Sequence, residues 1–417
     1  MSNEILLLLA LRLLAEPPLD GREGRPLALQ NFRPKSQLIV PRTEIVRAKF
    51  PVVDVHVHPR LRFRHLPEEL EAFVRIMDEQ NVAVCVSMDG GLGDALEEHK
   101  EYLWTEHRGR FVIFANLDWR GEGRVDEPAT WGVNQPGFGR RMAHALTDAQ
   151  ERGATGLKVF KDLGLSLRSG DGSLIQIDDP RFDLIWEACG RLGMPVLIHT
   201  ADPVAFFEPI DEQNERWEEL RRHPEWSFYG AEFPSHASLL EALLRVVERH
   251  PRTLFIAAHM LNCAENLGAL SRSLDRYPNL YVDLTSRINE LGRQPFTARE
   301  FFLKHSDRIL FGSDGPRPGA RLLPQWRFLE SRDEYFPYSE NPFPPQGFWN
   351  IYGIELPDDV LRKVYHENAA RIIPGVKERL ERAREMGTPD RPDGEPVRQP
   401  AVEGRGCISH RSPSARS

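Results

Sequence analysis

The sequence contains few cysteines and no apolar run long enough to cross a membrane. Only four of its 417 residues are cysteine, and no two of them form a Cys-x-x-Cys pair: Cys85, Cys189, Cys263 and Cys407. This spacing argues against a disulfide framework and against a cysteine-based zinc knuckle. The apolar run Ile5–Ala15 is interrupted by Arg12 and is shorter than the roughly 20 residues of a membrane-spanning helix.

Excess positive charge is also missing. Lysine and arginine number 54 against 62 aspartate and glutamate, which gives a net charge of -8 and a pI near 6.0. A protein that binds nucleic acid or a membrane surface electrostatically is typically basic. We therefore expect a small-molecule substrate and no nucleic-acid partner, and the sequence leaves open whether the chain forms a homo-oligomer.

The apolar run Ile5–Ala15 raises the question of targeting. It is similar to the apolar part of a signal peptide, but Glu4 stands where a basic residue is usual and no clear small-x-small cleavage site follows. An amphipathic helix that packs on the domain is the equal alternative. We expect a cytoplasmic protein, with an exported form left open.

No glycine-rich phosphate loop follows any apolar run, which argues against a doubly wound open sheet. Instead, eight short apolar runs alternate with amphipathic helices, a pattern that predicts an α/β fold of the (β/α)8 TIM-barrel type. The expected strands are 53–58, 82–88, 111–118, 154–160, 195–200, 254–260, 280–286 and 309–313. The expected helices are 67–80, 94–107, 140–152, 181–193, 239–250, 267–276, 298–305 and 358–373.

Composition divides the chain into three parts. Residues 1–50 include a stretch rich in proline and charge and are expected to form an N-terminal leader. Residues 51–380 hold the barrel, with a long insertion after strand five that runs to Ser235. Residues 381–417 become rich in proline, arginine and serine, and we expect a disordered C-terminal tail there.

The strongest motif is Val-Asp-Val-His-Val-His at 53–58. Side chains alternate along a strand, so Asp54, His56 and His58 share one face, and two imidazoles at the end of a strand can reach one ion. Active sites of such barrels gather at the C-terminal ends of the strands. Further polar residues end later apolar runs: Lys158, His199, His259 and Asp314.

Taken together, these positions resemble the amidohydrolase superfamily. The likeness is closest to the amidohydrolase-related group that contains aminocarboxymuconate-semialdehyde decarboxylase. Phe-Gly-Ser-Asp-Gly-Pro at 311–316 and His-Glu-Asn-Ala-Ala-Arg at 366–371 match motifs usual in that group, and the likeness covers roughly residues 50–375. It implies a metal-dependent hydrolase type of barrel with a divalent metal, most often Zn²⁺.

The resemblance also implies roles for individual residues. His56, His58, His199 and Asp314 would hold the metal and leave one position open for water or substrate. Asp314 would also act as general base, and His259 would orient the water or polarise a substrate carbonyl. Asp54 lies deeper on the same face, so we expect it to support the ligands and not to bind the metal.

Lys158, in Gly-Leu-Lys-Val-Phe, has two readings. It pairs with Asp314 or a substrate carboxylate in a site with one metal ion, or it is carbamylated and bridges two ions; we favour the first. Arg287 is expected to clamp a substrate carboxylate, unless it is an ordinary surface arginine. Asp89 and Asp118 are weaker candidates for substrate contacts. Aromatic residues of the insertion would wall the pocket or pack on one another.

These features favour an enzyme that uses a metal-activated water to cleave the C–N or C–O bond of an amide, lactone or ester. The alternative on the same ligands is a non-oxidative decarboxylase of a small carboxylic acid. A binuclear, phosphotriesterase-like enzyme remains open through Lys158. A non-catalytic protein on a decayed barrel would lack ligands, and none of the expected ligands is missing from the sequence.

Overall fold

The computed structural model describes residues 21–24, 26–28, 31–32, 34–316, 322–339, 346–385 and 398–399. The chain divides into two compact units, residues 1–39 with 402–417 and residues 40–401. A short 3-10 turn at Gly21–Glu23 lies in the first unit. The run Ile5–Ala15, for which the sequence predicts a signal or a helix, lies outside the described residues.

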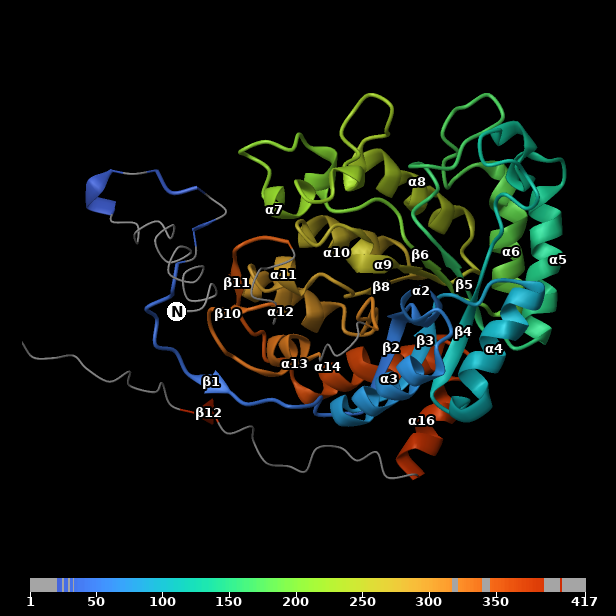
Figure 1. Ribbon diagram of the computed structural model, residues 1–417. Helices are drawn as coiled ribbons and strands as arrows, with labels where there is room; N and C mark the ends of the chain where they lie inside the picture. Colours follow the sequence, from blue (N-terminus) through green and yellow to red (C-terminus); the bar gives the residue numbers. More distant parts are fainter. Residues whose placement is uncertain are drawn as a thin grey trace, which may run out of the picture. The chain divides into compact units, whose positions relative to one another are not determined.

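Eight parallel strands form the centre of the larger unit and neighbour one another in sequence order (Figure 1). They are β2 (Val52–Val57), β3 (Val82–Ser87), β4 (Phe111–Asn116), β5 (Gly156–Val159), β6 (Val196–Ile198), β7 (Phe255–Ala257), β8 (Leu280–Asp283) and β9 (Ile309–Leu310). Their side chains are buried, with Asn116 half-buried, as in parallel sheets covered by helices. The predicted (β/α)8 barrel is confirmed.

Backbone contacts between the ends of β9 and β2 bring the first and last strands together. The Val55 N–H donates to the Phe311 carbonyl and the Asp314 N–H donates to the His56 carbonyl, both at 3.0 Å. Val57 and Gly315 form a parallel bridge. The residues after β9 are thereby held against the Asp-Val-His-Val-His segment of β2.

Helices follow the strands and pack around them (Figure 1). They are α3 (Pro67–Gln80), α4 (Gly93–His107), α5 (Phe138–Glu151), α6 (Asp183–Leu192), α8 (His236–Arg249), α10 (Leu267–Arg276), α12 (Pro295–Lys304), and α14 (Asp358–Arg362) with α15 (Asn368–Ile372), joined by a π-helical turn at Lys363–Glu367. Residues at the helix N-termini determine where some of the helices begin. Pro67 is the first residue of α3, and the Ser235 side chain caps α8 by accepting from the Ser238 N–H at 3.2 Å.

The loops contain further elements that the sequence does not predict. They are α2 (Pro59–Phe63), α7 (Trp217–Leu220), α9 (Ala258–Leu261), α11 (Ile288–Leu291), α13 (Leu323–Glu330), and the antiparallel pair β10 (Phe336–Pro337) and β11 (Asn350–Ile351). Short 3-10 turns occur at Pro128–Thr130, Gly132–Asn134, Pro180–Phe182, Val204–Phe207 and Pro224–Trp226. Most of these pieces are too short to show a helical or strand period in the sequence.

Structured residues extend beyond both ends of the range 51–380 that the sequence predicts for the barrel. Ile45, Ala48 and Phe50 are buried in the core, so the core begins before residue 51. Helix α16 (Val376–Glu385) continues past residue 381, where the sequence predicts the tail to begin, and β12 (Arg398–Gln399) pairs with β1 (Arg42–Thr43). The rest of the predicted disordered tail lies outside the described residues.

Among the described residues, no helix combines the length and apolar character that a bilayer-spanning segment requires.

Candidate metal centre

Three side chains converge where β2 ends and β9 has just ended. His56 and His58 come from β2 and the residue that follows it, and Asp314 lies in the turn after β9. One ligand atom from each of the three lies within 4.8 Å of the others, a spacing that can hold a metal ion. Strand alternation places the two imidazoles on one face, as the sequence predicts.

His56 is held by a buried carboxylate on its far side. Its Nδ1 lies 2.9 Å from Asp283 Oδ2, and both side chains are inaccessible to solvent. An ionised carboxylate only accepts hydrogen bonds, so the ring proton sits on Nδ1 and the Nε2 lone pair faces the ligand group. Burial, followed by the charge of Lys158, lowers the pKa of His56 well below its usual value.

His58 has an equivalent support. Its Nδ1 lies 2.7 Å from Asp89 Oδ1, while Asp89 Oδ2 accepts from the backbone N–H groups of Arg60 at 3.1 Å and Leu61 at 3.3 Å. His58 Nε2 lies 3.6 Å from Asp314 Oδ1. The sequence offers Asp89 as a weak candidate for substrate contact; in the structure its carboxylate is occupied by holding His58 in place.

Asp54 connects the end of β2, which carries His56, with the turn after β9, which carries Asp314. Its Oδ1 accepts from the His56 N–H at 3.2 Å and from the Ser313 N–H at 3.0 Å. Burial raises the pKa of this carboxyl group to about 7. Its contacts are with backbone groups beside the ligands and with the Ser313 side chain, as a supporting role requires.

Asp314 adopts a left-handed backbone conformation with φ of 61°. Burial opposes its ionisation, but the effects of His56, His58 and Lys158 outweigh burial and lower the pKa of Asp314. Its side chain is 27% exposed, more than any other member of the group. Asp314 is therefore an ionised carboxylate that solvent or a substrate can reach.

His259 lies beside the group with its tautomer fixed. Its backbone N–H donates to Asp283 Oδ1 at 2.9 Å, and its Nδ1 lies 3.0 Å from the Thr285 carbonyl oxygen. A carbonyl only accepts, so the ring proton sits on Nδ1 and Nε2 carries a lone pair. Burial lowers the pKa of His259 well below its usual value, and its ring centroid lies 5.1 Å from that of His56.

His199 stands next to His259 and lies outside the group of three. The two ring centroids are 4.4 Å apart, and His199 Nε2 lies 3.5 Å from Asp202 Oδ1. Asp202 also accepts from Lys161 Nζ at 2.5 Å. His199 Nε2 is buried, and its nearest polar partner among the described residues is this Asp202 carboxylate at 3.5 Å, too long for a well-formed hydrogen bond.

Lys158 is 1% exposed, and its ammonium group contacts His56. Nζ lies 3.1 Å from His56 Nε2. The sequence predicts that Lys158 pairs with Asp314 or with a substrate carboxylate; its hydrogen-bond partner in the structure is the His56 imidazole and not Asp314, and pairing with a substrate stays a prediction. Burial lowers the pKa of Lys158 to about 8, against the opposing charges of Asp283, Asp314 and Asp89.

Arg287 is a buried residue, which excludes the surface-arginine alternative. Its Nη2 donates to Asn262 Oδ1 and its Nη1 donates to the Ser286 carbonyl at 2.8 Å. Both terminal nitrogens of the guanidinium group therefore have protein partners. Fewer of its N–H groups are available to bind a substrate carboxylate than the sequence predicts. Asp118 is exposed and accepts from the N–H groups of Arg120 and Gly121, so it caps a surface turn.

The aromatic insertion after β6 packs mainly on itself. Phe207 and Phe228 have ring centroids 5.5 Å apart, and Phe228 meets Phe233 edge-on at 5.3 Å. One contact reaches toward the site: Lys161 Nζ lies 5.3 Å from the centre of the Phe228 ring while it binds Asp202. The insertion is thus linked to His199 through two charged side chains.

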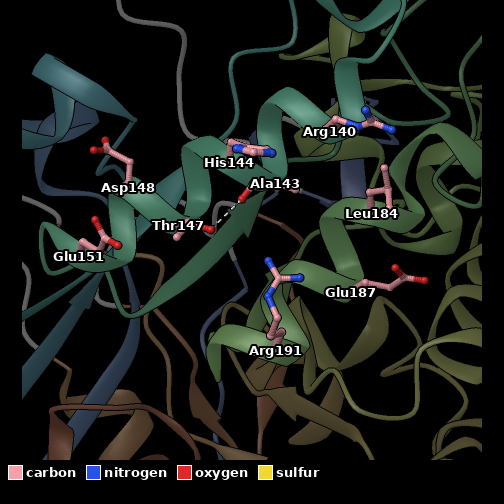
Figure 2. A pocket seen from close by; sticks show the side chains of 9 residues that line it. All are labelled: Arg140, Ala143, His144, Thr147, Asp148, Glu151, Leu184, Glu187 and Arg191. Carbon is pink, nitrogen blue, oxygen red and sulfur yellow. Dashed lines mark hydrogen bonds between the residues drawn. The ribbon is translucent and has the colours of Figure 1, made fainter.

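A separate groove lies between α5 and α6 and is lined by side chains of these two helices (Figure 2). Its polar lining includes Arg140, His144, Glu187 and Arg191. None of the predicted site residues lines this groove. The candidate metal centre is therefore distinct from it.

Three residues important to the centre were not assigned a role from the sequence: Asp283, Asp202 and Lys161. Asp283 is the last residue of β8, Leu-Tyr-Val-Asp. Its position at the end of a strand is the signal that could have identified it from the sequence. Asp202 and Lys161 lie in loops, whose conformation a sequence pattern does not specify.

The donor set fits a divalent transition metal. Two imidazole nitrogens and one carboxylate oxygen are the ligand types of catalytic zinc sites, and imidazole serves other divalent metals as well. Each ring nitrogen that faces the group belongs to a histidine fixed through its other nitrogen, the arrangement usual around bound metals.

Comparison with known protein families gives a match over most of the chain. The amidohydrolase family model Amidohydro_2 matches residues 53–375. Comparison with the curated proteins gives no match.

Three solved structures illustrate the similarity. 2,6-Dihydroxybenzoate decarboxylase from Rhizobium is 16% identical, with a TM-score of 0.44 over 78% of this chain and 98% of that chain. Dihydroorotase from Campylobacter jejuni is 14% identical, with a TM-score of 0.45 over 79% and 85%. Dihydroxybenzoic acid decarboxylase from Polaromonas sp. JS666, with bound manganese, is 14% identical, with a TM-score of 0.46 over 78% and 96%. These scores are too low to carry an argument about the reaction. The family match, which spans the whole barrel, shows that the chain belongs to the amidohydrolase superfamily.

Proposed function

We propose that the chain is a metal-dependent hydrolase that cleaves the C–N or C–O bond of an amide, lactone or ester in a small molecule. One observation carries the proposal. Buried carboxylates occupy Nδ1 of both His56 and His58, so Nε2 is the nitrogen left to each ring for the group with Asp314, and His56 Nε2 also contacts Lys158 Nζ at 3.1 Å. Such a group is suited to holding a metal that activates water.

His56, His58 and Asp314 would hold the metal, with the buried Nε2 of His199 as a fourth donor. Zn²⁺ is the expected ion. A divalent cation bound here supplies Lewis acidity and lowers the pKa of a coordinated water towards about 7.

Two residues handle protons and orientation. Asp314 is ionised and reachable, so it accepts the proton of the attacking water and returns it to the leaving group. His259 presents an unprotonated Nε2, so it orients the water by accepting a hydrogen bond. Of the two roles expected for His259, the fixed tautomer favours orienting water over polarising a carbonyl.

Lys158 bears on how many metal ions the site takes. Its ammonium group lies beside His56, where it adds positive charge to a site with one ion. Carbamylation would replace that charge with a carboxylate-like ligand and permit a second ion. We retain the one-ion site as the proposal, and elemental analysis of wild type and Lys158→Ala separates the two: loss of one of two ions per chain would support the binuclear site.

The same residues support a second candidate, the non-oxidative decarboxylation of a small carboxylic acid. The observation in its favour is the buried positive charge of Lys158 next to the ligand group, which is complementary to a substrate carboxylate. Arg287 remains a further candidate for binding that carboxylate, through the Nε that is unpaired among the described residues.

The test measures products over a panel of lactones, esters, amides and aromatic and aliphatic carboxylic acids. Hydrolysis incorporates ¹⁸O from labelled water into the product, whereas decarboxylation releases carbon dioxide without that label in the organic product. Label incorporation that disappears in Asp314→Asn supports the hydrolase. Carbon dioxide release without label transfers the assignment to the second candidate.

A further inference from the structure

A continuous series of hydrogen bonds runs from the surface to the turn that carries Asp89. Glu98 Oε1 lies 3.3 Å from His65 Nδ1, and His65 Nε2 lies 3.0 Å from His99 Nδ1. His99 Nε2 lies 2.7 Å from Ser87 Oγ, which accepts from the Asp89 N–H at 3.4 Å. The chemistry proposed above uses none of Glu98, His65, His99 and Ser87.

The outer end of this series determines the direction of every bond. The Glu98 carboxylate accepts from His65 Nδ1, which leaves His65 Nε2 as the acceptor toward His99. His99 must then donate from Nδ1, which leaves its Nε2 as an acceptor for the Ser87 hydroxyl proton. The Ser87 oxygen therefore turns a lone pair to the Asp89 N–H.

This arrangement requires a neutral His99, and the surroundings keep it neutral. Its side chain is inaccessible to solvent, and burial lowers the pKa of His99 to about 3. Both ring nitrogens have partners of complementary type, so the series has no unsatisfied donor or acceptor between Glu98 and Asp89. A buried network of this kind has one low-energy arrangement.

The series fixes one side of the turn after β3, and Asn116 fixes the other. Asn116 Nδ2 donates to the Met88 carbonyl at 2.7 Å, and Asn116 Oδ1 accepts from the Gly91 N–H at 3.0 Å. Between these anchors lies Asp89, whose carboxylate binds His58 Nδ1 at 2.7 Å. A shift of this turn would rotate or release the His58 imidazole.

We propose that Ser87 and His99 are positioning residues for His58, which act by holding the turn that carries Asp89. The proposal rests on the proposed function, because His58 matters in this way only as a metal ligand. It assigns a role to residues on β3 and α4 that do not contact the ligand group. Residues that hold the hydrogen-bond partner of a metal ligand change the affinity of the site for the metal without supplying a ligand atom.

The test measures the affinity of the full chain for Zn²⁺, by competition with a chelator, and the visible absorption spectrum of the Co²⁺-loaded chain. In His99→Leu the Ser87 hydroxyl loses its acceptor, and we expect Zn²⁺ affinity to fall roughly tenfold or more, with an altered Co²⁺ spectrum. His99→Gln retains an acceptor and a donor, and it should restore most of the affinity. Ser87→Ala should behave like His99→Leu.

Ser271 and His305 provide a matched control. Ser271 Oγ lies 2.7 Å from His305 Nε2, the same type of bond at the same length, and it connects α10 to the residue after α12 with no link to the ligand group. Ser271→Ala should leave Zn²⁺ affinity and the Co²⁺ spectrum unchanged, while thermal unfolding reports the stability change of each variant.

The outcomes separate the two proposals. Wild-type affinity and spectrum in both His99→Leu and Ser87→Ala would overturn the positioning role while the metal centre stands. Equal loss in His99→Leu and His99→Gln would also overturn it, because the hydrogen bond would then not be the cause. If wild type binds Zn²⁺ no better than His58→Ala, the metal centre itself is refuted, and the positioning role falls with it.

Discussion

His56 and His58 each commit one ring nitrogen to a buried carboxylate, and this determines which nitrogen remains for a ligand. Asp283 and Asp89 accept from the two Nδ1 atoms, so neither ring can flip without leaving a buried acceptor unpaired. An unpaired buried acceptor is destabilising by about 1–3 kcal/mol. The orientation of both imidazoles is therefore set by the fold.

The first prediction follows from this geometry. His56→Ala and Asp314→Asn each remove one of the three converging ligand atoms, so we expect bound metal and turnover to be lost while the barrel stays folded. Metal analysis, product assay and circular dichroism measure the three properties. His107→Ala is the control, because His107 pairs with Glu71 at the surface. Near-normal turnover in either ligand variant would contradict the assignment.

At this scale the sequence predicts ligands better than their supports. Strand parity and strand ends, both visible in the sequence, predicted that His56, His58 and Asp314 lie together, whereas His199, also a predicted ligand, lies outside this group of three. Lys158 was placed near the site, but its partner is His56, because its reach depends on a rotamer that no sequence pattern specifies. The contacts of the Arg287 terminal nitrogens with Asn262 and Ser286 also depend on the side-chain rotamer, so the sequence did not predict them.

The elements that hold the site include close approaches that only small residues allow. A Cβ added to Gly312 would lie 2.2 Å from Thr285 Oγ1 and 3.1 Å from His56 Cβ. A side chain at position 312 would therefore collide with Thr285 and crowd His56 on β2. Glycine in Phe-Gly-Ser-Asp therefore avoids a side-chain clash beside His56 and Asp314.

Gly312→Ala should accordingly lower both stability and metal affinity. Overpacking of a buried site destabilises by about 1–3 kcal/mol, and the shift would displace His56 or the Asp314 turn. Urea unfolding and Zn²⁺ titration measure the two effects. Adding Thr285→Ala removes the closest clash, so the double variant should recover part of the lost stability. A double variant whose losses are simply additive would contradict this account.

His99, on helix α4, makes the free energy of unfolding depend on pH. The folded-state pKa of about 3 lies below the value of 6.5 expected in the unfolded chain, owing to burial, with Asp89, His65 and Arg60 as smaller influences. Above pH 6.5 neither state binds the proton. As the pH falls below 6.5, the unfolded chain takes up a proton that folded His99 refuses, so stability falls by up to about 1.4 kcal/mol per pH unit.

His99→Gln removes this contribution, so its stability should decline less steeply than that of wild type between pH 6.5 and pH 5. Urea unfolding at pH 7, 6 and 5 gives the two slopes, and their difference isolates His99 from the other buried histidines. Parallel slopes would show that the pKa of His99 in the folded protein is close to its unfolded value, which would contradict the proposed effect of burial.

Element positions were largely predictable, and loop structure was not. Helices α3 and α10 match the predicted ranges because proline or a polar cap starts each one and apolar residues recur at helical spacing. The insertion after β6 gave only an aromatic composition, and its packing of Phe207, Phe228 and Phe233 depends on contacts between loops. Helix α16 reaches Glu385, past residue 381 where the sequence places the start of the tail, and the disorder predicted for the tail stays a prediction.

For the molecule as a whole, the candidate metal centre spans the seam where the barrel closes. His56 and His58 belong to the first strand of the barrel, whereas Asp314 follows the last strand, about 250 residues later in the sequence. Asp54 reinforces the same seam by accepting backbone N–H groups from both sides. An ion held by these ligands would therefore bind the folded barrel and not the unfolded chain.

Metal removal should then lower global stability through linkage. A ligand that binds only the folded state at 100 times its Kd raises the free energy of unfolding by about 2.7 kcal/mol. We expect chelator treatment to lower the Tm of wild type, and re-addition of Zn²⁺ to restore it. In the double variant His56→Ala, Asp314→Asn neither step should change the Tm, because two of the three ligand atoms are absent.

Hydrogen exchange locates the effect within the molecule. The Val55 and Asp314 amides donate across the seam, at 3.0 Å each, so their protection should fall on chelation more than that of amides in α5 and α6, which lie on other elements. Uniform loss of protection would indicate that the ion stabilises the barrel without fastening its seam. No change in Tm or in protection would mean that these three ligands do not bind a metal at all.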